Sequence, residues 1–462
     1  MVGKEKPLKI GLEIHCYLDT VEKLFCKCST AAGDHQNTHI CPICTAQPGS
    51  KPMLVNDEAV RKLIQVSLIL GCKINSDVDL LFNRKHYNWA DLPKGFQNTI
   101  SGAHTKFPAE KGEFKGIGIW ECHLEEDPAQ WNPETGHINY NRSGLPLVEA
   151  VTAPDFKSVE EVIFWLKSFL LSLSYIKAIR KNAGIKVDVN VSTMGERVEM
   201  KNLNSLENIE KALKYEIARQ YEVFENGGKV EQETRRYDVH TGKTTRMRGK
   251  ENAADYRFIS DPDLPVVKID KKLVEEIKKN LPETPDEKLD KLISKFNIDK
   301  KNAEILSKNL ELVEFVEGLV EEGINIKKNI AWITIELLRI LNYNKKTLDD
   351  SDVEIKPEHL AELIKLVESG GITVLKAKQV MNDFIPKSFS IKEKGDIAKI
   401  ADDAVVNIVK KVIKENQKPV DDFKRGEKNA LNFLVGQVMK KSERRADFNT
   451  ARAELLKILE GE

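Results

Sequence analysis

The sequence predicts an α+β domain followed by two all-α domains. The first 270 or so of its 462 residues hold all seven cysteines, all but one of the nine histidines and most of the glycines, and they mix strand and helix patterns. After about Lys271 the chain becomes rich in Lys, Glu and Leu and is mostly helical in pattern. The segment from Leu281 to Lys288 contains two prolines and indicates a junction. At roughly 100–200 residues per domain, the length predicts about three domains.

The composition narrows the class of protein. Lys plus Arg is 72 and Asp plus Glu is 72, so a purely electrostatic nucleic-acid binder is disfavoured, although a local basic patch is compatible with zero net charge. Hydrophobic residues are 41% and charged residues 31% of the chain, which supports buried cores. No apolar run reaches about 18 residues, and the N-terminal MVGKEKPLKIGLEIH has no signal-peptide core. We therefore expect a cytoplasmic protein with no membrane partner.

Three helices and a hairpin stand out in the first part. Alternation of Val187, Val189 and Val191 with polar residues predicts a strand, and Val198 and Met200 predict its hairpin partner. The predicted helices have capping signals at their ends. These signals are Asn56 and Gly71 for the first helix, a capping box of Ser158 and Glu161 for the second, and a box of Asn204 and Glu207 with a stop at Gly227-Gly228 for the third.

Four cysteines predict a structural Zn²⁺ site in a loop at 26–44. Cys26-x-Cys28 and Cys41-x-x-Cys44 are two close pairs, and such pairs can fold back to place four thiolates in a tetrahedron. A full set of four thiolates leaves no open position, so the site is expected to be structural. The other three cysteines, Cys16, Cys72 and Cys122, have no spaced partner and are predicted to be core residues.

Carboxylates and histidines recur on the predicted strands. Glu13 and His15 are two residues apart and therefore share one strand face. His123 and Glu125 share a face in the same way, while Glu126 takes the opposite one unless a bulge re-aims it. Glu149 lies among apolar residues, where an unpaired carboxylate is costly, and Asp188 lies on the polar face of the hairpin.

Such a set suits Mg²⁺ or Mn²⁺ bound together with phosphate oxygens. The alternatives are a solvated strand face, a surface acidic run, and an ion pair between Glu149 and Arg142. No Walker A loop is present, because Tyr237 stands where that motif needs glycine, and there is no HExxH or nucleophile elbow. Any ATP chemistry would therefore use a different phosphate cradle.

A series of motifs resembles one known family from about Gly11 to the C-terminus, in order and with compatible spacing. The motifs are GLEIH, CKCST with CPIC, FNRKHYNWADLPKGFQ, HLEEDP, NYNRSGLPLVEAV, VDVNVS with EMKNLNS, QETRRYD with TGKTTRMRGKENAADYR, DPDLP and KNALNFLVGQVMK. The family is GatB, the B-type subunit of the tRNA-dependent amidotransferases. The related archaeal E-type subunit has a large insertion after the catalytic region, whereas here DPDLP runs directly into helices, so the resemblance favours GatB.

The resemblance implies a domain plan and an activity. It implies a catalytic cradle domain over 1–290, a helical domain over 291–398 and a tRNA-binding tail domain over 399–462. The activity is ATP-dependent phosphorylation of the side-chain carboxylate of Asp-tRNA(Asn) or Glu-tRNA(Gln), followed by amidation with ammonia.

The resemblance also implies protein partners. The ammonia comes from glutamine hydrolysed by an amidase (glutaminase) partner, and a small third protein braces the pair. Nothing in this chain resembles the Ser-Ser-Lys machinery of the amidase, so that partner is required. A non-discriminating aminoacyl-tRNA synthetase is a further candidate partner.

Roles for single residues follow from the same resemblance. The family's Mg²⁺ ligands correspond to His15, Glu149 and one of Glu125 or Glu126; strand alternation favours Glu125 and the register within the motif favours Glu126. Glu13 and Asp188 correspond to further acidic residues of that site, and Lys85 and Tyr87 to residues where an ammonia channel opens. The remaining basic candidates contact phosphates or the substrate carboxylate, or else form ordinary ion pairs: Arg142, Lys201, Arg235 and Arg236.

Basic residues also cluster in the tail, where they suit the phosphates of a tRNA, the alternative being a solvated helix face. After Val-Met-Lys the chain reads KSERRADFNTAR, where the family usually has a Gly-rich turn containing Asn-Pro. This departure affects the tail's contacts with tRNA and not the family. The cluster is Lys424, Arg425, Lys428, Lys440, Lys441, Arg444 and Arg445.

Two rival hypotheses fit part of these observations. A non-catalytic, zinc-containing tRNA-binding module explains the cysteines and the tail but not the strand carboxylates. A stand-alone ligase that uses free ammonia explains the carboxylates without a partner. The sequence does not distinguish Asp-tRNA(Asn) from Glu-tRNA(Gln) as the substrate.

Overall fold

The computed structural model describes residues 8–31, 35–87, 89–180, 185–249, 256–393 and 397–461. The chain forms two compact units, Met1–Glu283 and Thr284–Glu462. Their boundary falls inside the proline-containing segment that the sequence indicates as a junction. Part of one quoted motif, Lys250 to Asp255, lies outside the described residues.

The first unit is built on a twelve-stranded, mostly antiparallel sheet within its described part. The main path of strands runs β13-β12-β11-β10-β1-β9-β6-β4-β3-β14, with β5 beside β6 and β2 beside β5. Strands β7 and β8 form a separate pair. The strands are β1 (Lys9–Tyr17), β2 (Lys73–Ile74), β3 (Asn83–His86), β4 (Phe96–Thr99), β5 (Ala109–Phe114), β6 (Ile117–Glu126), β7 (Gln130–Trp131), β8 (Ile138–Asn139), β9 (Pro146–Thr152), β10 (Ile185–Ser192), β11 (Val198–Leu203), β12 (Glu233–Asp238), β13 (Lys243–Gly249) and β14 (Ile259–Ser260).

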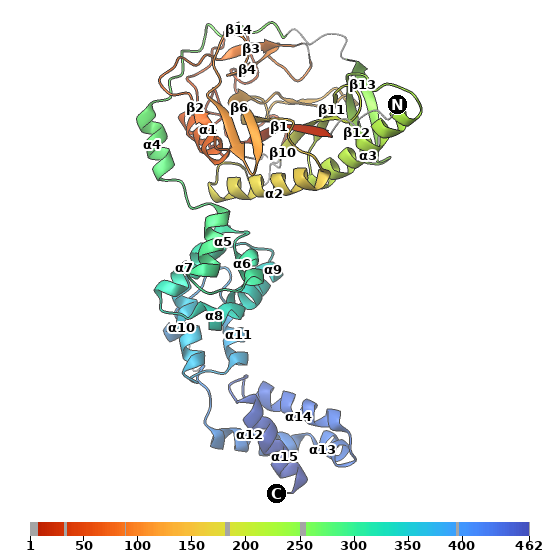
Figure 1. Ribbon diagram of the computed structural model, residues 1–462. Coiled ribbons are helices and arrows are strands. Elements are labelled where there is room, and N and C mark those ends of the chain that lie inside the picture. Colours follow the sequence, from red (N-terminus) through yellow and green to blue (C-terminus); the bar gives the residue numbers. More distant parts are fainter. Residues whose placement is uncertain are drawn as a thin grey trace. The chain divides into compact units, whose positions relative to one another are not determined.

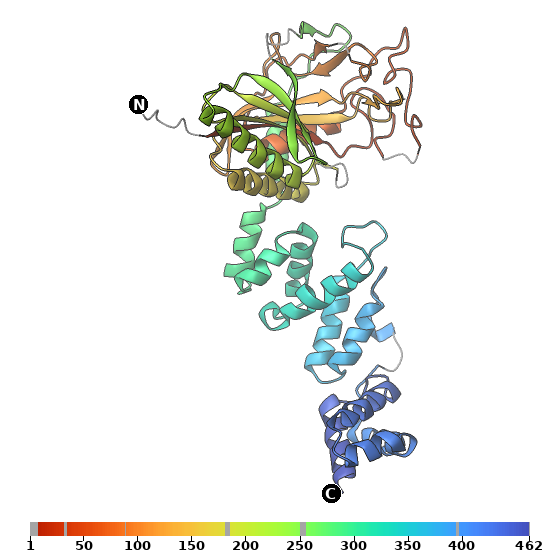
Figure 2. The ribbon, with the colours of Figure 1, turned by 90° about the vertical axis from the view of Figure 1, so that its right-hand side faces the viewer.

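Helices cover one face of this sheet. Helices α1 (Asp57–Ile69), α2 (Val159–Tyr175) and α3 (Leu206–Glu225) lie along one side, while β3, β4 and β14 lie on the other, as Figures 1 and 2 show from two directions. A fourth helix, α4 (Lys271–Lys279), packs against α1. β4 pairs with β6 at a single position, Thr99 opposite Glu125, and with β3 it lies over the side of the sheet away from the helices (Figure 1). The face away from the helices is thereby partly covered.

Alternation along the central strands separates an apolar face from a polar one. In β1, Leu12 and Ile14 are fully buried in the core with the helices, and Glu13 and His15 point the other way. In β10, Val187, Val189 and Val191 occupy the same core, as predicted. β10 and β11 form the predicted hairpin, with a register shift between Val187 and Val189. The polar residues of neighbouring strands are therefore collected on the face opposite α2.

Two of the three helix starts agree with the sequence, and the third is displaced by one residue. Asn56 caps α1 by accepting from the backbone N–H groups of Glu58 and Ala59, as predicted. Ser158 caps α2, but the Glu161 carboxylate accepts from the Lys157 N–H rather than closing the box on Ser158. Helix α3 is capped by Ser205, one residue after the predicted Asn204, because the Ser205 side chain accepts from the Asn208 N–H. The first difference changes the partner of Glu161 and the second moves the start of α3 by one residue; both leave the buried faces unchanged.

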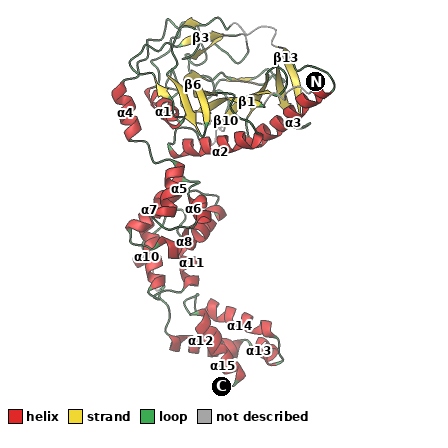
Figure 3. Cartoon of the chain, in the orientation of Figure 1, coloured by secondary structure: helices red, strands yellow, loops and turns green. Residues whose placement is uncertain are grey.

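The regular elements of the second unit, within its described residues, are helices joined by loops, apart from one isolated bridge between Glu354 and Lys387 (Figure 3). It contains two separate hydrophobic cores, one from Leu292 to Ile391 and one from Val405 to Leu459. Two cores agree with the predicted helical and tail domains, whose boundary near residue 398 stays a prediction. The helices are α5 (Pro285–Ser294), α6 (Lys300–Leu306), α7 (Leu310–Glu321), α8 (Ile326–Ala331), the π-helix η1 (Trp332–Leu337), α9 (Leu338–Tyr343), α10 (Pro357–Glu368), α11 (Val374–Asn382), the 3₁₀ turn η2 (Ile391–Glu393), α12 (Asp402–Glu415), α13 (Gln417–Lys424), α14 (Lys428–Lys441) and α15 (Phe448–Glu460).

The predicted order, a mixed strand-and-helix domain followed by helical domains, is confirmed. Among the described residues, no helix is both long enough and apolar enough to cross a bilayer.

Candidate active site and cysteine centre

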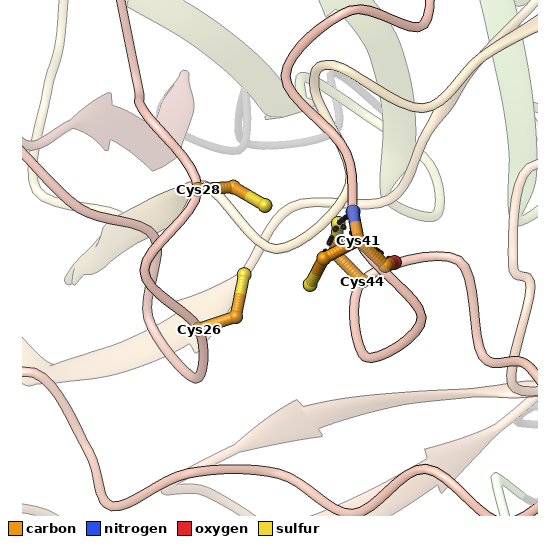
Figure 4. Close-up of side chains that lie close together, drawn as sticks. All are labelled: Cys26, Cys28, Cys41 and Cys44. Carbon is orange, nitrogen blue, oxygen red and sulfur yellow. Dashed lines mark hydrogen bonds between the residues drawn. The ribbon is translucent and has the colours of Figure 1, made fainter.

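The four spaced cysteines lie together, and their two pairs face each other (Figure 4). All four sulfur atoms are within 4.8 Å of one another, and those of Cys41 and Cys44 are 3.9 Å apart. Four thiolates around one zinc ion, with Zn–S bonds of about 2.3 Å, have sulfur atoms about 3.8 Å apart. The cluster therefore fits a closed tetrahedral metal site. The other cysteines, Cys16, Cys72 and Cys122, are buried and outside it, as predicted.

A buried lysine contacts this cluster. Lys23 is only 1% exposed, and its ammonium donates to Cys44 Sγ at 3.5 Å and to the Tyr140 carbonyl at 3.1 Å. It forms no ion pair with a carboxylate in the described parts of the chain. The hydrogen bond from Cys26 lowers the pKa of the Cys44 thiol to about 5. Burial opposes this shift, and the charge of Lys23 adds to it. An anionic sulfur cluster gives this buried cation a counter-charge.

The strand carboxylates and histidines form a second cluster, built by cross-strand register. His15 of β1 lies opposite Glu149 of β9, and Glu149 lies opposite His123 of β6. Glu149 Oε2 is 3.4 Å from His15 Nε2 and 3.5 Å from His123 Nε2. Glu125 Oε1 is 3.5 Å from the same His15 nitrogen. Glu13 lies opposite Asp188 of β10, which brings a fourth strand to the same face.

The charges of this cluster shift its pKa values in opposite directions. Burial raises the pKa of Glu13 to about 7, with a further contribution from Glu149. Burial lowers the pKa of His15, but its contact with Glu149 and the charge of Glu125 outweigh burial and raise it to about 9. Burial works against ionised Glu149, but His123 and His15 hold its pKa well below its usual value. A buried group of carboxylates that depends on neighbouring positive charge is typical of a functional site.

The two members of the Glu125-Glu126 pair are separated by the strand. Glu125 points toward His15, whereas Glu126 points away and binds the Lys94 ammonium and the Asn98 N–H, the latter at 2.9 Å. Glu125 therefore lies in the histidine cluster and Glu126 lies outside it, as strand alternation predicts. Which of the two glutamates binds a metal ion stays a prediction. Glu126 instead lines a cavity of about 310 Å³ beside the cysteine cluster, together with Lys94, Asp261 and Asp263.

Two residues of the cluster lie outside the predicted set. The sequence places His123 on the face of Glu125 without giving it a role, and the prediction does not include Glu121. Glu121 Oε1 is 3.5 Å from His123 Nδ1. The alternating pattern of WECHLEE places Glu121, His123 and Glu125 on one face, so the signal was present in the sequence.

Arg142 does not pair with Glu149. Its Nε is 2.7 Å from Asp127 Oδ2, which also accepts from the Tyr17 hydroxyl at 3.0 Å. Burial raises the pKa of Asp127 to about 6, and the charge of Arg142 opposes that shift. The alternative of a Glu149–Arg142 ion pair is therefore wrong, because Arg142 binds the last acidic residue of HLEEDP.

Lys85 and Tyr87 lie beside the cluster on and just after β3. Burial lowers the pKa of Lys85, but the charges of Glu125, Glu149 and Glu13 outweigh it, so the net shift is upward. The Tyr87 hydroxyl donates to Gln97 Oε1 at 3.2 Å. Both residues thus reach the side of the cluster that β3 and β4 cover.

The remaining basic candidates divide into two groups. Lys201 is 2.7 Å from Asp188 and 3.1 Å from Glu199, and the exposed Arg236 lies opposite Lys201 on β12. Arg235 points to the other face of the sheet, where it pairs with Glu233 at 2.7 Å. The ion-pair alternative therefore applies to Arg235, which is not at the site.

The basic cluster of the tail is divided between the two ends of α14. Lys428 begins this helix and Lys440 and Lys441 end it, about 18–20 Å away at 1.5 Å per residue. The Arg445 guanidinium donates to the Ala398 carbonyl at 2.8 Å and is half-buried. The tail thus presents two basic groups instead of one patch: Lys424, Arg425 and Lys428 at one end, and Lys440, Lys441 and Arg444 at the other.

The histidine-carboxylate cluster has the donor set of a divalent-cation site. Glu13, His15 and Glu149 each offer one ligand atom within 4.8 Å of the others. Among the described residues, the buried Glu125 Oε2 has no hydrogen-bond partner. Oxygen-rich sets with an imidazole suit Mg²⁺ or Mn²⁺, and an ion would satisfy the unpaired oxygen.

The fold and this site define a chain of the GatB/GatE catalytic-domain class: that family matches residues 8–275, and the GatB domain family matches residues 314–459. Three relatives are each named as the B-type subunit of aspartyl/glutamyl-tRNA(Asn/Gln) amidotransferase. The protein from Methanocaldococcus jannaschii is 43% identical over 95% of this chain and 95% of its own length. Those from Methanosphaera stadtmanae and Methanococcus aeolicus are 42% and 41% identical over 95% and 98% of this chain, and 96% and 98% of their own lengths.

The chain therefore belongs to the GatB family of amidotransferase proteins. The chain matches relatives named as the B-type subunit over nearly their whole length, which favours GatB over the archaeal E-type protein. The direct run from DPDLP into helices predicts the same assignment.

We predict that Arg142→Gln destabilises the first unit and that the loss grows with pH. Because burial raises the pKa of Asp127 to about 6, ionisation of Asp127 destabilises the fold as the pH rises through that value, and Arg142 reduces the cost. The guanidinium is 34% exposed, so the expected loss at pH 8 is about 1–3 kcal/mol, shrinking toward pH 5. Thermal unfolding at both pH values measures it.

Arg61→Gln is the matched control. Arg61 and Glu276 form an ion pair in which both side chains are about half exposed, so its loss should change stability by less than about 0.5 kcal/mol at either pH. An equal loss for Arg142→Gln at pH 5 and pH 8 would contradict the role given to Asp127.

Proposed function

We propose that the chain is the ATP-dependent transamidation component that converts Asp-tRNA(Asn), Glu-tRNA(Gln) or both into the amidated aminoacyl-tRNA. The observation that carries this proposal is the cluster of Glu13, His15, Glu125 and Glu149 on one face of the sheet, in a chain of the GatB family. A non-catalytic tRNA-binding module does not explain this cluster, because burying several carboxylates is costly and binding tRNA does not require them.

The reaction proceeds in two steps, phosphorylation and amidation. An oxygen of the substrate's side-chain carboxylate attacks the γ-phosphorus of ATP, forming an acyl phosphate and releasing ADP. Ammonia then attacks the acyl carbon, phosphate leaves, and the nitrogen gives up a proton. A carboxylate is a poor electrophile, and phosphorylation supplies the leaving group that amide formation needs.

We assign His15, Glu125 and Glu149 to hold Mg²⁺ or Mn²⁺, with Glu13 and Asp188 adjacent. The ion, when bound, offsets negative charge on the phosphate oxygens. Glu13, which lies beside the proposed ligands and opposite Asp188, is placed to take a proton from the incoming nitrogen. Lys201, held by Asp188 and Glu199, and Arg236 opposite it on β12 are placed to bind anionic groups of the substrates.

We further propose that the nitrogen reaches this site from an amidase (glutaminase) partner, with a small third protein in the complex. Lys85 and Tyr87 would line the point of entry, since they lie beside Glu125 on the strands that cover the cluster. The two basic groups at the ends of α14 would bind tRNA phosphates, because both are exposed and lie about 20 Å apart.

The cysteine centre is proposed to hold one structural Zn²⁺. Four sulfur atoms at tetrahedral spacing leave no position open for a substrate, so Cys26, Cys28, Cys41 and Cys44 would stabilise their loops. The loop is tied to the active-site strands: Leu24 donates to the Gly144 carbonyl just before β9. Loss of the ion is therefore expected to loosen that connection.

We predict that the purified chain contains one zinc per molecule and that Cys41→Ser abolishes it, because three thiolates and a hydroxyl bind zinc far more weakly. Metal analysis by mass spectrometry measures this. Cys72→Ser, which changes a buried thiol outside the cluster, should retain one zinc. Equal zinc content in the two variants would contradict the assignment.

Glu149→Gln is predicted to reduce amidation by about 100-fold or more, because it removes the carboxylate shared by the two histidines. The assay combines the chain with the amidase and the small third protein, ATP, Mg²⁺, glutamine and either Asp-tRNA(Asn) or Glu-tRNA(Gln), and it measures amidated aminoacyl-tRNA. Using both substrates in turn also establishes which one the chain accepts.

Replacing glutamine with ammonium distinguishes a defect in the amidation site of this chain from a defect in glutamine hydrolysis by the amidase. The wild-type chain should form product from either donor, whereas Glu149→Gln should fail with both. Glu160→Gln, an exposed change on α2, is the matched control and should keep wild-type activity. Product from glutamine without the amidase would contradict the partner assignment, and full activity of Glu149→Gln would contradict the site.

A further inference from the structure

A second group of possible metal ligands adjoins the site described above. Glu121, His123 and Glu149 each offer one ligand atom, and these atoms lie within 4.8 Å of one another. Glu121 and His123 are two residues apart on β6, and His123 lies opposite Glu149 on β9, so the backbone fixes all three on one face. Glu149 belongs to this group and also to the group with Glu13 and His15.

The contact between Glu121 and His123 has the length expected of two ligands around an ion, because Glu121 Oε1 is 3.5 Å from His123 Nδ1. Glu149 Oε2 is 3.5 Å from the other ring nitrogen, Nε2, and the carboxylate belongs to the group through its position within 4.8 Å of the other ligand atoms. A hydrogen bond between imidazole and carboxylate has its heavy atoms about 2.7–3.2 Å apart. Two ligands bound to one cation at about 2.0–2.2 Å lie about 3 to 3.5 Å apart.

An unsatisfied buried atom gives independent support. The His123 side chain is 2% exposed, and its Nδ1 makes no hydrogen bond within the part of the chain that the structure describes. It is aimed at Glu121, whose side chain is 22% exposed and therefore reachable from solvent. Buried imidazole nitrogens are normally paired, so a nitrogen left at 3.5 Å from a carboxylate oxygen points to a missing ligand between them.

We propose that Glu121, His123 and Glu149 form a second divalent-cation site, with Glu149 bridging it to the ion held by His15 and Glu125. One imidazole and two carboxylates suit Mn²⁺ or Mg²⁺ rather than a thiolate-seeking metal. Two ions that share a carboxylate lie about 3.5–4 Å apart in known two-metal sites. The binding site stands on its own geometry; a role for the second ion in phosphoryl transfer would rest on the proposed function.

The test counts Mn²⁺ ions on the zinc-loaded chain in magnesium-free buffer. Electron paramagnetic resonance measures free Mn²⁺ during a titration and reports whether bound ions are magnetically coupled. The wild type should bind two Mn²⁺ per chain with a broadened, coupled signal. Glu121→Gln should bind one Mn²⁺, and the coupling should disappear.

This test measures Mn²⁺ binding alone and needs no catalytic assay. Glu113→Gln changes an exposed carboxylate on the neighbouring strand β5 and should retain two coupled ions. One Mn²⁺ per wild-type chain would overturn the proposal even if Glu121→Gln failed to fold, and two coupled ions in a folded Glu121→Gln variant would overturn it as well. The proposed function can fail in the amidation assay without changing this count.

Discussion

The register of three antiparallel strands is the constraint on which the site depends. Pairing of β1, β9 and β6 places His15, Glu149 and His123 in one row across the sheet. The residues between them on each strand pack against the helices, so a shift of one residue would bury the carboxylates in the apolar core. The fully buried Leu12, Ile14 and Val148 oppose such a shift. The hydrophobic core on one face therefore fixes the chemistry on the other.

The arrangement concentrates negative charge where a phosphorylated substrate would bring more. Glu13, Glu125, Glu149 and Asp188 come from four neighbouring strands. Histidines, Lys201 and Lys85 compensate part of that charge, as the raised pKa values of His15 and Lys85 indicate. Divalent cations would complete the compensation, and they would convert a cluster that repels ATP into one that binds it. The cysteine centre contributes differently, through Lys23 and the backbone bonds that tie its loop to the start of β9.

The sequence predicted most of this arrangement, because alternation along a strand determines which side chains share a face. It placed Glu13 with His15, grouped the four cysteines, and assigned Glu125 and Glu126 to opposite faces. It could not predict which strands are neighbours, since β1 pairs with β9 and β10 across 130 residues of chain or more. For that reason the pairing of Arg142 with Asp127, the turn of Arg235 away from the site and the contact of Glu121 with His123 emerged only from the structure. The separation of the tail's basic residues into two groups likewise became visible only when the structure gave the bounds of α14.

The central claim is that the cluster activates a carboxylate by phosphorylating it. The direct measurement uses aminoacyl-tRNA whose side-chain carboxylate carries ¹⁸O, in the complete complex with ATP and an ammonia source. Mass spectrometry of the released phosphate then reports the fate of the labelled oxygen. An acyl phosphate transfers one ¹⁸O to phosphate for each amide formed, and this is the predicted result. Amide formation with unlabelled phosphate would contradict the account, because the carboxylate oxygen would then never have been bonded to phosphorus.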